Sequence, residues 1–447
     1  MRDGSDMIRG GITGSLLRFT LPMIAGSLLQ QCYNIADTLI VGRYVGADAL
    51  AAVGSSYTLM VFLLSVLIGL SLGSGTVFSL QYGAGRPQAV RRSIYVSMVM
   101  TGSVCCLLNV AALVWLGSVL RLMQVPAEVF GIMYGYMRII LFGMAFTFVY
   151  NFYAALLRAV GDSVTPLVFL AVSVSLNIAL DLMFIVGLDG GIEGAAWATV
   201  IAQAVAAAGM VIYVRLRHPD LRLRREDMRF DVKSFKEIVS FSSLTCVQQS
   251  VMNLGILLVQ GIVNGFGTTV MAAFAAAVKI DSFAYMPVQE FGNAFSTFVA
   301  QNFGAGRYDR IRVCVRRAFL LASVFSVAIS AAVFLFAEPL MLIFVGSEYA
   351  DIVAAGVDYL RIEGAFYVGI AILFLWYGYY RAVKMPAMSV VLTVISLGLR
   401  VALSYAAAGV DTIGVTGIWW SIPIGWIAAD LVGWACYRRG RRLRSYM

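Results

Sequence analysis

Long apolar runs recur about every 30 to 40 residues along this chain, and each is long enough to cross a bilayer as a helix. The runs are continuous rather than short and alternating, which favours helices over the strands of a membrane barrel. Only 13% of the residues are charged and 60% are hydrophobic, whereas soluble domains are roughly 25% charged. The sequence therefore predicts an all-α polytopic membrane protein with twelve transmembrane helices. The predicted spans are residues 16–42, 52–81, 93–117, 130–156, 164–188, 191–214, 238–265, 270–301, 314–337, 352–380, 386–409 and 413–437.

The distribution of basic residues predicts the orientation, because short basic loops stay on the cytoplasmic side of a membrane. Of the 33 Lys and Arg residues, 27 fall at one set of helix ends and in the connecting segments there, and only Arg43 and Arg121 fall at the opposite ends. We therefore expect both termini in the cytoplasm and the chain in the cell (inner) membrane. The net charge of +9 then faces anionic lipid, and no nucleic-acid partner is needed to explain it.

The chain contains an internal repeat. The segment "QYGAGR" (81–86) aligns with "NFGAGR" (302–307) at an offset of 221 residues, and "YMRI" (136–139) aligns with "YLRI" (359–362) at an offset of 223. Six helices per half is an even number, so both halves enter the membrane from the same side. This predicts two six-helix bundles related by a pseudo-two-fold axis along the membrane normal.

The repeat also predicts the domain organisation, with an N-terminal lobe at 1–214, a basic cytoplasmic linker at 215–236 and a C-terminal lobe at 237–447. Two such lobes are typical of transporters that work by alternating access. The alternative is that the repeat reflects only the duplication of a helical scaffold.

Ionisable residues inside the spans are the strongest functional signal, since each costs roughly 3 kcal/mol at mid-helix. Asp37 has no counterpart in the second half, where the 221 offset places Leu258. Asp181 lies one turn after Asn177, and Thr199 follows on the next span. Counting residues from the helix ends places these four groups at a similar depth in one lobe, so we expect them to converge.

This cluster offers two carboxylates, an amide and a hydroxyl, which are hard oxygen ligands suited to a small cation. If the cation is Na⁺, its ligands are Asp37, Asn177, Asp181 and Thr199. Mutually repelling buried carboxylates also bind protons, so Na⁺ and H⁺ both remain open as coupling ions. The alternative reading is that each Asp caps a broken helix or pairs with Arg138. No other cofactor is expected, because the six cysteines show no metal-ligand spacing.

Several motifs in this order resemble the multidrug and toxin extrusion (MATE) family, most closely its DinF-like branch. They are the segment "YNIADTLIVGRYVGADALAAVG", the two "GAGR" turns and "LRAVGDSVTP". The resemblance covers nearly the whole chain. It implies that the four-residue cluster binds the coupling cation, that Tyr33 and Tyr136 line the same pocket, and that the first helix bends at a hinge at Pro22.

The NorM-like branch of the family uses carboxylates on helices 7 and 10, and this sequence departs from that pattern. The corresponding stretches, "SSLTCVQQSVMNLGI" and "GIAILFLWYGYY", contain no acid. Asp281 and Glu290 on helix 8 are the remaining second-half candidates for lining a drug cavity. Lys279 and Glu290 lie eleven residues apart on one face, so mutual neutralisation is the alternative for Glu290.

The resemblance implies a secondary active antiporter, not an enzyme, that exports drugs or other small organic compounds in exchange for Na⁺ or H⁺. Its expected partners are the small-molecule substrate and the lipid bilayer, and we expect a monomer. One alternative is a flippase of a lipid-linked sugar, which predicts a more cationic cavity. Another is an intramembrane aspartyl protease, which is disfavoured because no Gly-x-Gly precedes Asp181.

Overall fold

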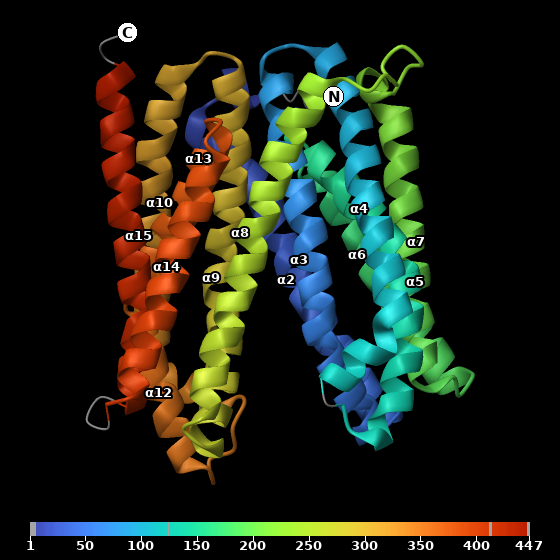
Figure 1. The fold of residues 1–447 in the computed structure, drawn as a ribbon, viewed down its shortest axis with the longest axis vertical. Helices are drawn as coiled ribbons and strands as arrows, with labels where there is room; N and C mark the ends of the chain where they lie inside the picture. The colour runs from blue at the N-terminus through green and yellow to red at the C-terminus, as the bar shows by residue number, and fades with distance from the viewer. Residues whose placement is uncertain (1–5, 124, 411–413, 445–447) are drawn as a thin grey trace. The chain divides into compact units, whose positions relative to one another are not determined.

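The computed structural model describes residues 6–123, 125–410 and 414–444, and every regular element among them is a helix. The elements of the first half are α1 (Asp6–Arg9), α2 (Ile12–Tyr44), α3 (Ala47–Gly83), α4 (Pro87–Leu122), α5 (Ala127–Ala159), α6 (Val164–Asp181), the π-helix η1 (Leu182–Gly187), α7 (Gly191–Arg217) and the 3-10 helix η2 (Pro219–Leu221). Those of the second half are α8 (Val232–Asn264), α9 (Thr268–Gly304), α10 (Tyr308–Leu335), α11 (Ala337–Leu342), α12 (Ala350–Gly364), α13 (Tyr367–Ala382), α14 (Pro386–Ala408) and α15 (Gly414–Arg444) (Figure 1).

Within the described residues, eleven helical segments are long and apolar enough to cross a membrane, and α12 with α13 makes a twelfth span if the bent pair is counted as one. The predicted all-α polytopic fold is therefore confirmed. Each predicted span corresponds to an observed helix or helix pair, although residue 413, where the last predicted span begins, lies outside the described residues.

One predicted span, 352–380, is broken. The helices α12 and α13 meet at a bend of 52° around Ala365 and Phe366. At the break the amides of Phe366 and Gly369 bond to carbonyls only three residues back, at 3.0 and 2.8 Å, so the regular i to i−4 ladder is interrupted. The apolar run continues through this point, which is why hydropathy alone predicts a single helix.

The chain divides into two compact units. The first unit comprises Leu21–Cys246 together with the residues up to Arg9, and the second comprises Gly10–Thr20 together with the chain from Val247 onward. Two helices therefore contribute to both units: α2 passes from the second unit to the first at Thr20, and α8 passes from the first to the second at Cys246. The predicted boundaries at 214 and 237 stay a prediction.

The segment between α7 and α8, predicted as a linker, is attached to the first unit by a buried ion pair. Arg91 Nε on α4 donates to Asp227 Oδ2 at 2.6 Å, and Asp227 is fully buried. Removing one partner of such a buried ion pair strongly destabilises the folded protein, because the other charge is left buried and unpaired. The basic segment therefore packs as part of the first unit.

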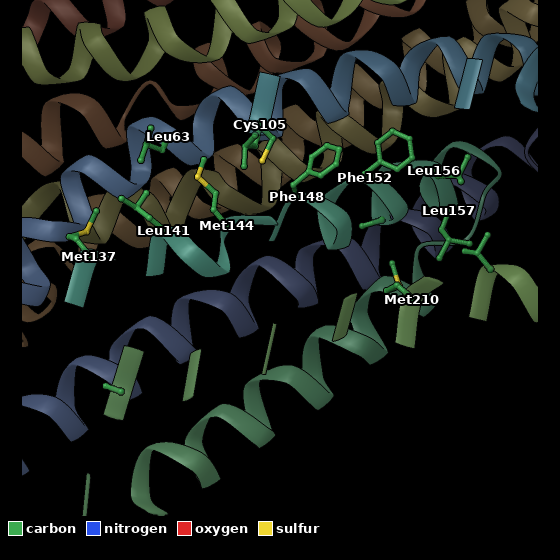
Figure 2. Close-up of a cluster of buried hydrophobic side chains, with 14 of the residues drawn as sticks. Leu63, Cys105, Met137, Leu141, Met144, Phe148, Phe152, Leu156, Leu157 and Met210 are labelled. Atoms are coloured by element: carbon green, nitrogen blue, oxygen red, sulfur yellow. The ribbon is translucent and has the colours of Figure 1, made fainter. Parts of the chain in front are cut away.

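In the first unit, α5 packs against α3, α4 and α7 (Figure 1). Most of its buried residues up to Phe152 lie on one helix face. Figure 2 shows Met137, Leu141, Met144, Phe148 and Phe152 in this core, at spacings of three and four residues. Close approach between helices rather than expulsion of water drives association inside a bilayer, so small residues matter most. A Cβ on Gly143 of α5 would lie 2.5 Å from Val200 Cγ2 of α7, so glycine is required for this contact.

In the second unit, α9, α12, α13 and α15 surround a core rich in aromatic rings. Phe274 stacks on Trp419 with ring centroids 5.4 Å apart, and Tyr359 meets the edge of both rings. This aromatic core holds α12 against α9 and α15 and so fixes the side chains that point inward from α12.

Candidate functional site

Six predicted residues gather on four helices of the first unit. Tyr33 and Asp37 lie one turn apart on α2, Asn177 and Asp181 lie one turn apart at the end of α6, Tyr136 is on α5 and Thr199 is on α7. Asn177 and Asp181 are buried, and the other four are half-buried. The expected convergence of the four-residue cluster is present in the structure, and the cation-coupling role stays a prediction.

Asn177 connects Asp181 to Thr199. With its amide turned so that both ends are paired, Asn177 donates to Asp181 Oδ2 at 2.8 Å, and its oxygen accepts from the Thr199 amide at 3.1 Å and from its hydroxyl at 3.2 Å. The Tyr33 hydroxyl lies 3.3 Å from Thr199 Oγ1. A chain of hydrogen bonds therefore joins α2, α7 and α6, and it ends on a carboxyl group.

Asp37 and Asp181 form a carboxyl pair. The two side chains lie within hydrogen-bonding reach of each other, and the hydroxyls of Tyr33 and Tyr136 lie near both. Each carboxyl group also has a buried Oδ1 that no donor reaches. Two ionised carboxylates repel at this range, so a stable pair requires a shared proton or a bound cation.

The alternative roles for these carboxylates do not match their surroundings. Arg138 is exposed, and no Lys or Arg in the described part of the chain acts on Asp37 or Asp181. Asp181 does lie at a helix junction, but its side chain makes no capping hydrogen bond there. The pair therefore carries negative charge with no fixed cation beside it.

The backbone around Asp181 departs from a regular helix. The α-helix α6 ends at Asp181 and continues directly as the π-helix η1, a conformation that recurs at functional sites. Gly191, with a φ of 55°, then turns the chain into α7. Gly194 of α7 packs so closely that an added Cβ would lie 3.1 Å from Phe184 Cβ, and this contact sets α7 beside α6 and Thr199 beside Asn177.

Chemically, the site presents two carboxyl groups, one amide oxygen and three hydroxyl groups. These oxygen ligands suit a proton or a hard cation such as Na⁺, and soft or nitrogen-binding transition metals are disfavoured. In the ranges that the structure describes, no group of three or more His, Cys, Asp or Glu side chains gathers in a metal-binding arrangement. When the two carboxyl groups share one proton, the pair retains one negative charge, which a monovalent cation or a second proton would compensate.

Pro22 lies inside α2, which continues through it from Ile12 to Tyr44. Two residues before Pro22, at Thr20, the residues of α2 change from the second compact unit to the first. A proline removes one backbone hydrogen bond and so weakens the helix at that point. The hinge role of Pro22 stays a prediction.

The second-half candidates lie in the second unit. Asp281 on α9 is 2% exposed, accepts a hydrogen bond from Tyr367 of α13, and lies within hydrogen-bonding reach of Tyr359 and Glu363 of α12. Glu290 is half-buried and lies about 13 Å further along α9 by helical rise. Lys279 is exposed. The cavity-lining roles of Asp281 and Glu290 stay a prediction.

Sequence reasoning missed the grouping of Asp281 with Glu363, Tyr359, Tyr367 and Arg400. The charged members are visible in the sequence as rare ionisable residues within apolar runs. Their convergence was not predictable, because it depends on the packing of α12 and α13 against α9, which brings Glu363 and Tyr367 toward the same residue.

A family model described as MatE matches the chain twice, at residues 22–183 and 245–406. The chain belongs to the MatE family. The two matched segments are offset by 223 residues, so the predicted internal duplication is confirmed. MatE proteins are transporters, so this chain is a multi-pass membrane transporter and not an enzyme, which excludes the protease alternative.

The curated MatE relatives include two proteins of Bacillus subtilis. The chain is 27% identical over 438 residues to "Probable multidrug resistance protein YoeA", covering 95% of this chain and 93% of that protein. It is 28% identical over 437 residues to "Probable multidrug resistance protein YpnP", covering 98% and 97%. A solved MOP superfamily transporter from Pyrococcus furiosus shares the fold, with a TM-score of 0.92 at 23% identity and coverage of 98% and 97%. The assignment to the DinF-like branch stays a prediction.

Proposed function

We propose that this MatE transporter exports small organic compounds, including drugs, in exchange for Na⁺ or H⁺ by alternating access. Curated relatives over nearly the full length are named as multidrug resistance proteins, which supports drugs as the substrate class. The observation that carries the coupling proposal is the pair of Asp37 and Asp181, which lie within hydrogen-bonding reach of each other and have no Lys or Arg acting on them in the described ranges.

The proposed exchange follows from the charge of this pair. A buried carboxyl pair that needs a proton or a cation is more stable loaded than empty, because loading removes the repulsion. Asn177 and Thr199 fix the orientation of Asp181, and Tyr33 connects them to the helix that carries Asp37. Loading and unloading on opposite membrane sides then couples ion entry to substrate export, since only the difference in affinity between two states shifts their equilibrium.

The direct test measures drug efflux in everted membrane vesicles under two separate driving forces. A Na⁺ gradient at fixed pH drives efflux if Na⁺ is the coupling ion, and a pH gradient without Na⁺ drives it if protons are. Efflux that responds to neither gradient contradicts the proposal.

Asp37→Asn should reduce efflux to the vesicle background at an unchanged protein level, because one carboxyl of the pair is lost. The matched control is Asp189→Asn, which removes an exposed carboxylate at a positive-φ position that asparagine also tolerates. Full drug resistance in cells that carry Asp37→Asn would overturn the coupling role.

We further propose that the chain lies in the cell (inner) membrane as a monomer with both termini in the cytoplasm. The support is the concentration of Lys and Arg at one set of helix ends. A fluorescent protein fused to the C-terminus should be bright, and an alkaline phosphatase fusion at the same point should be inactive. The opposite pair of results contradicts this orientation.

A further inference from the structure

The second unit contains a buried polar cluster that the proposed coupling site does not use. Its members are at most 8% exposed and come from four helices: Asp281 (α9), Tyr359 and Glu363 (α12), Tyr367 (α13) and Arg400 (α14). Buried charges inside an apolar bundle are destabilising unless they are compensated, so the contacts of each member decide what the cluster can do.

Asp281 and Glu363 form a second carboxyl pair. They lie within hydrogen-bonding reach of each other, Tyr367 donates to Asp281, and Tyr359 also contacts both carboxyl groups. Asp281 Oδ2 and Glu363 Oε2 are buried and accept no hydrogen bond from a donor. Like the first pair, this one requires a shared proton or a cation.

Arg400 distinguishes the second pair from the first. Its guanidinium interacts electrostatically with Asp281, Glu363 and Tyr359. Among the described residues, Arg400 forms no ion pair with either carboxylate, so it acts on them through its charge at longer range. With one proton shared by the carboxyl groups, the cluster carries one negative and one positive charge and is neutral.

The repeat shows where this arginine comes from. At the offset of 223 residues, Arg400 occupies the position of Asn177, and Tyr359 occupies that of Tyr136. The carboxylates do not correspond, since Asp37 aligns with Leu258 at the offset of 221 that holds near the start of each half, and Glu363 aligns with Ile140 at the offset of 223. Each half therefore has its own carboxyl pair on different helices, and where the first half has an amide the second half has a permanent cation.

We propose that Arg400 is a built-in counter-cation that closes the Asp281–Glu363 pair to exchangeable cations, so that cation exchange takes place only at the Asp37–Asp181 pair. A guanidinium stays protonated at every physiological pH, so its charge cannot be released in a transport cycle. A cation bound in addition to the shared proton would give the cluster a net positive charge in an apolar surrounding, which is unfavourable. The fixed positive charge of Arg400 also repels any cation that would replace that proton. This inference deepens the proposed function and rests on it only for the role of the first pair.

The test uses the purified full-length protein and equilibrium binding of radioactive ²²Na⁺ at alkaline pH, where protons compete least. Arg400→Asn places in the second half the residue that the first half has. It should bind about one more Na⁺ per protein than the unmodified chain, and the added site should disappear in the double variant Arg400→Asn with Asp281→Asn. Arg400→Lys keeps the charge and should gain no site, while size-exclusion profiles check that each variant is folded.

Two results would overturn the inference. One is a folded Arg400→Asn variant with no added Na⁺ binding. The other is a loss of Na⁺ binding when Asp281→Asn is made alone, since the second pair would then already exchange cations. Unchanged efflux in Asp37→Asn would contradict the proposed function. That result would not affect the Na⁺-binding comparison between Arg400→Asn and the unmodified chain.

Discussion

The two halves of this transporter solve the same electrostatic problem in different ways. Both bury a carboxyl pair beside tyrosine hydroxyls, but the pair of Asp37 and Asp181 lies beside an amide, and the pair of Asp281 and Glu363 lies beside Arg400. A carboxyl pair without a fixed cation still carries a negative charge when it shares one proton, whereas a pair beside a fixed cation is neutral with that one proton. In our proposal, duplication provided two related bundles, and a few substitutions separated a cation-exchanging carboxyl pair from a closed one.

Backbone geometry separates the halves in a similar way. The helix α5 runs unbroken from Ala127 to Ala159, and its counterpart at the 223 offset is the bent pair α12 and α13. In the first unit the irregular backbone is instead the π-helix that follows Asp181. Each half departs from regular helix next to its own carboxyl pair, which supports the view that these irregularities position the pairs.

The largest expected effect comes from removing one buried carboxyl from each half. Asp181→Asn should reduce drug efflux to background, because the only charge left at the site is that of Asp37. Asp281→Asn should keep efflux within about twofold but lower the free energy of unfolding by about 2 kcal/mol, through loss of hydrogen bonds to a buried charged group. Efflux from everted vesicles measures transport by both variants, and thermal unfolding in detergent measures the change in stability. Equal loss of efflux in the two variants would contradict the functional asymmetry.

A smaller effect is expected for the hydroxyl that links Asn177 to Tyr33. Thr199→Val keeps the shape of the side chain and removes about 1 to 1.5 kcal/mol of hydrogen bonding, so the apparent affinity for the coupling ion should fall about tenfold. The matched control is Ile422→Val, at the position that corresponds to Thr199 in the second half. The half-saturating ion concentration for efflux is the measurement, and an unchanged value in Thr199→Val would show that the hydroxyl is dispensable.

The smallest effect concerns how the corresponding helices α6 and α14 begin. Asp162 Oδ1 accepts from the amides of Val164 at 3.1 Å and Thr165 at 3.0 Å, whereas the equivalent residue in the second half is Met385, where α14 has no side-chain cap. Asp162→Ala should lower the free energy of unfolding by about 1 kcal/mol, or roughly 2 °C in Tm, and Met385→Asp should raise it by about half as much. A rise in Tm for Asp162→Ala, or a fall in Tm for Met385→Asp, would contradict this account.

Part of the candidate site was predictable because its signal is local. Asp37, Asn177 and Asp181 are polar residues in continuous apolar runs. Because placing such groups inside a membrane span costs free energy, their presence there indicates a functional role. Counting helical rise was enough to place them at a similar depth. The assignment of Asp281 to a carboxyl pair was not predictable, because Glu363 lies 82 positions away and reaches it through the packing of α12 against α9.

By itself, the sequence determined the membrane-spanning helices, the duplication and the asymmetric carboxylate of the first half. These follow from hydrophobicity, residue spacing and the scarcity of charge, which are properties of short segments. Only the tertiary structure decided which buried groups meet, namely Asp37 with Asp181, Asp281 with Glu363, and Arg400 near the second pair only. The reason is that helix rotation, the 52° bend and close contacts such as Gly143 against Val200 arise from packing between segments far apart in the chain.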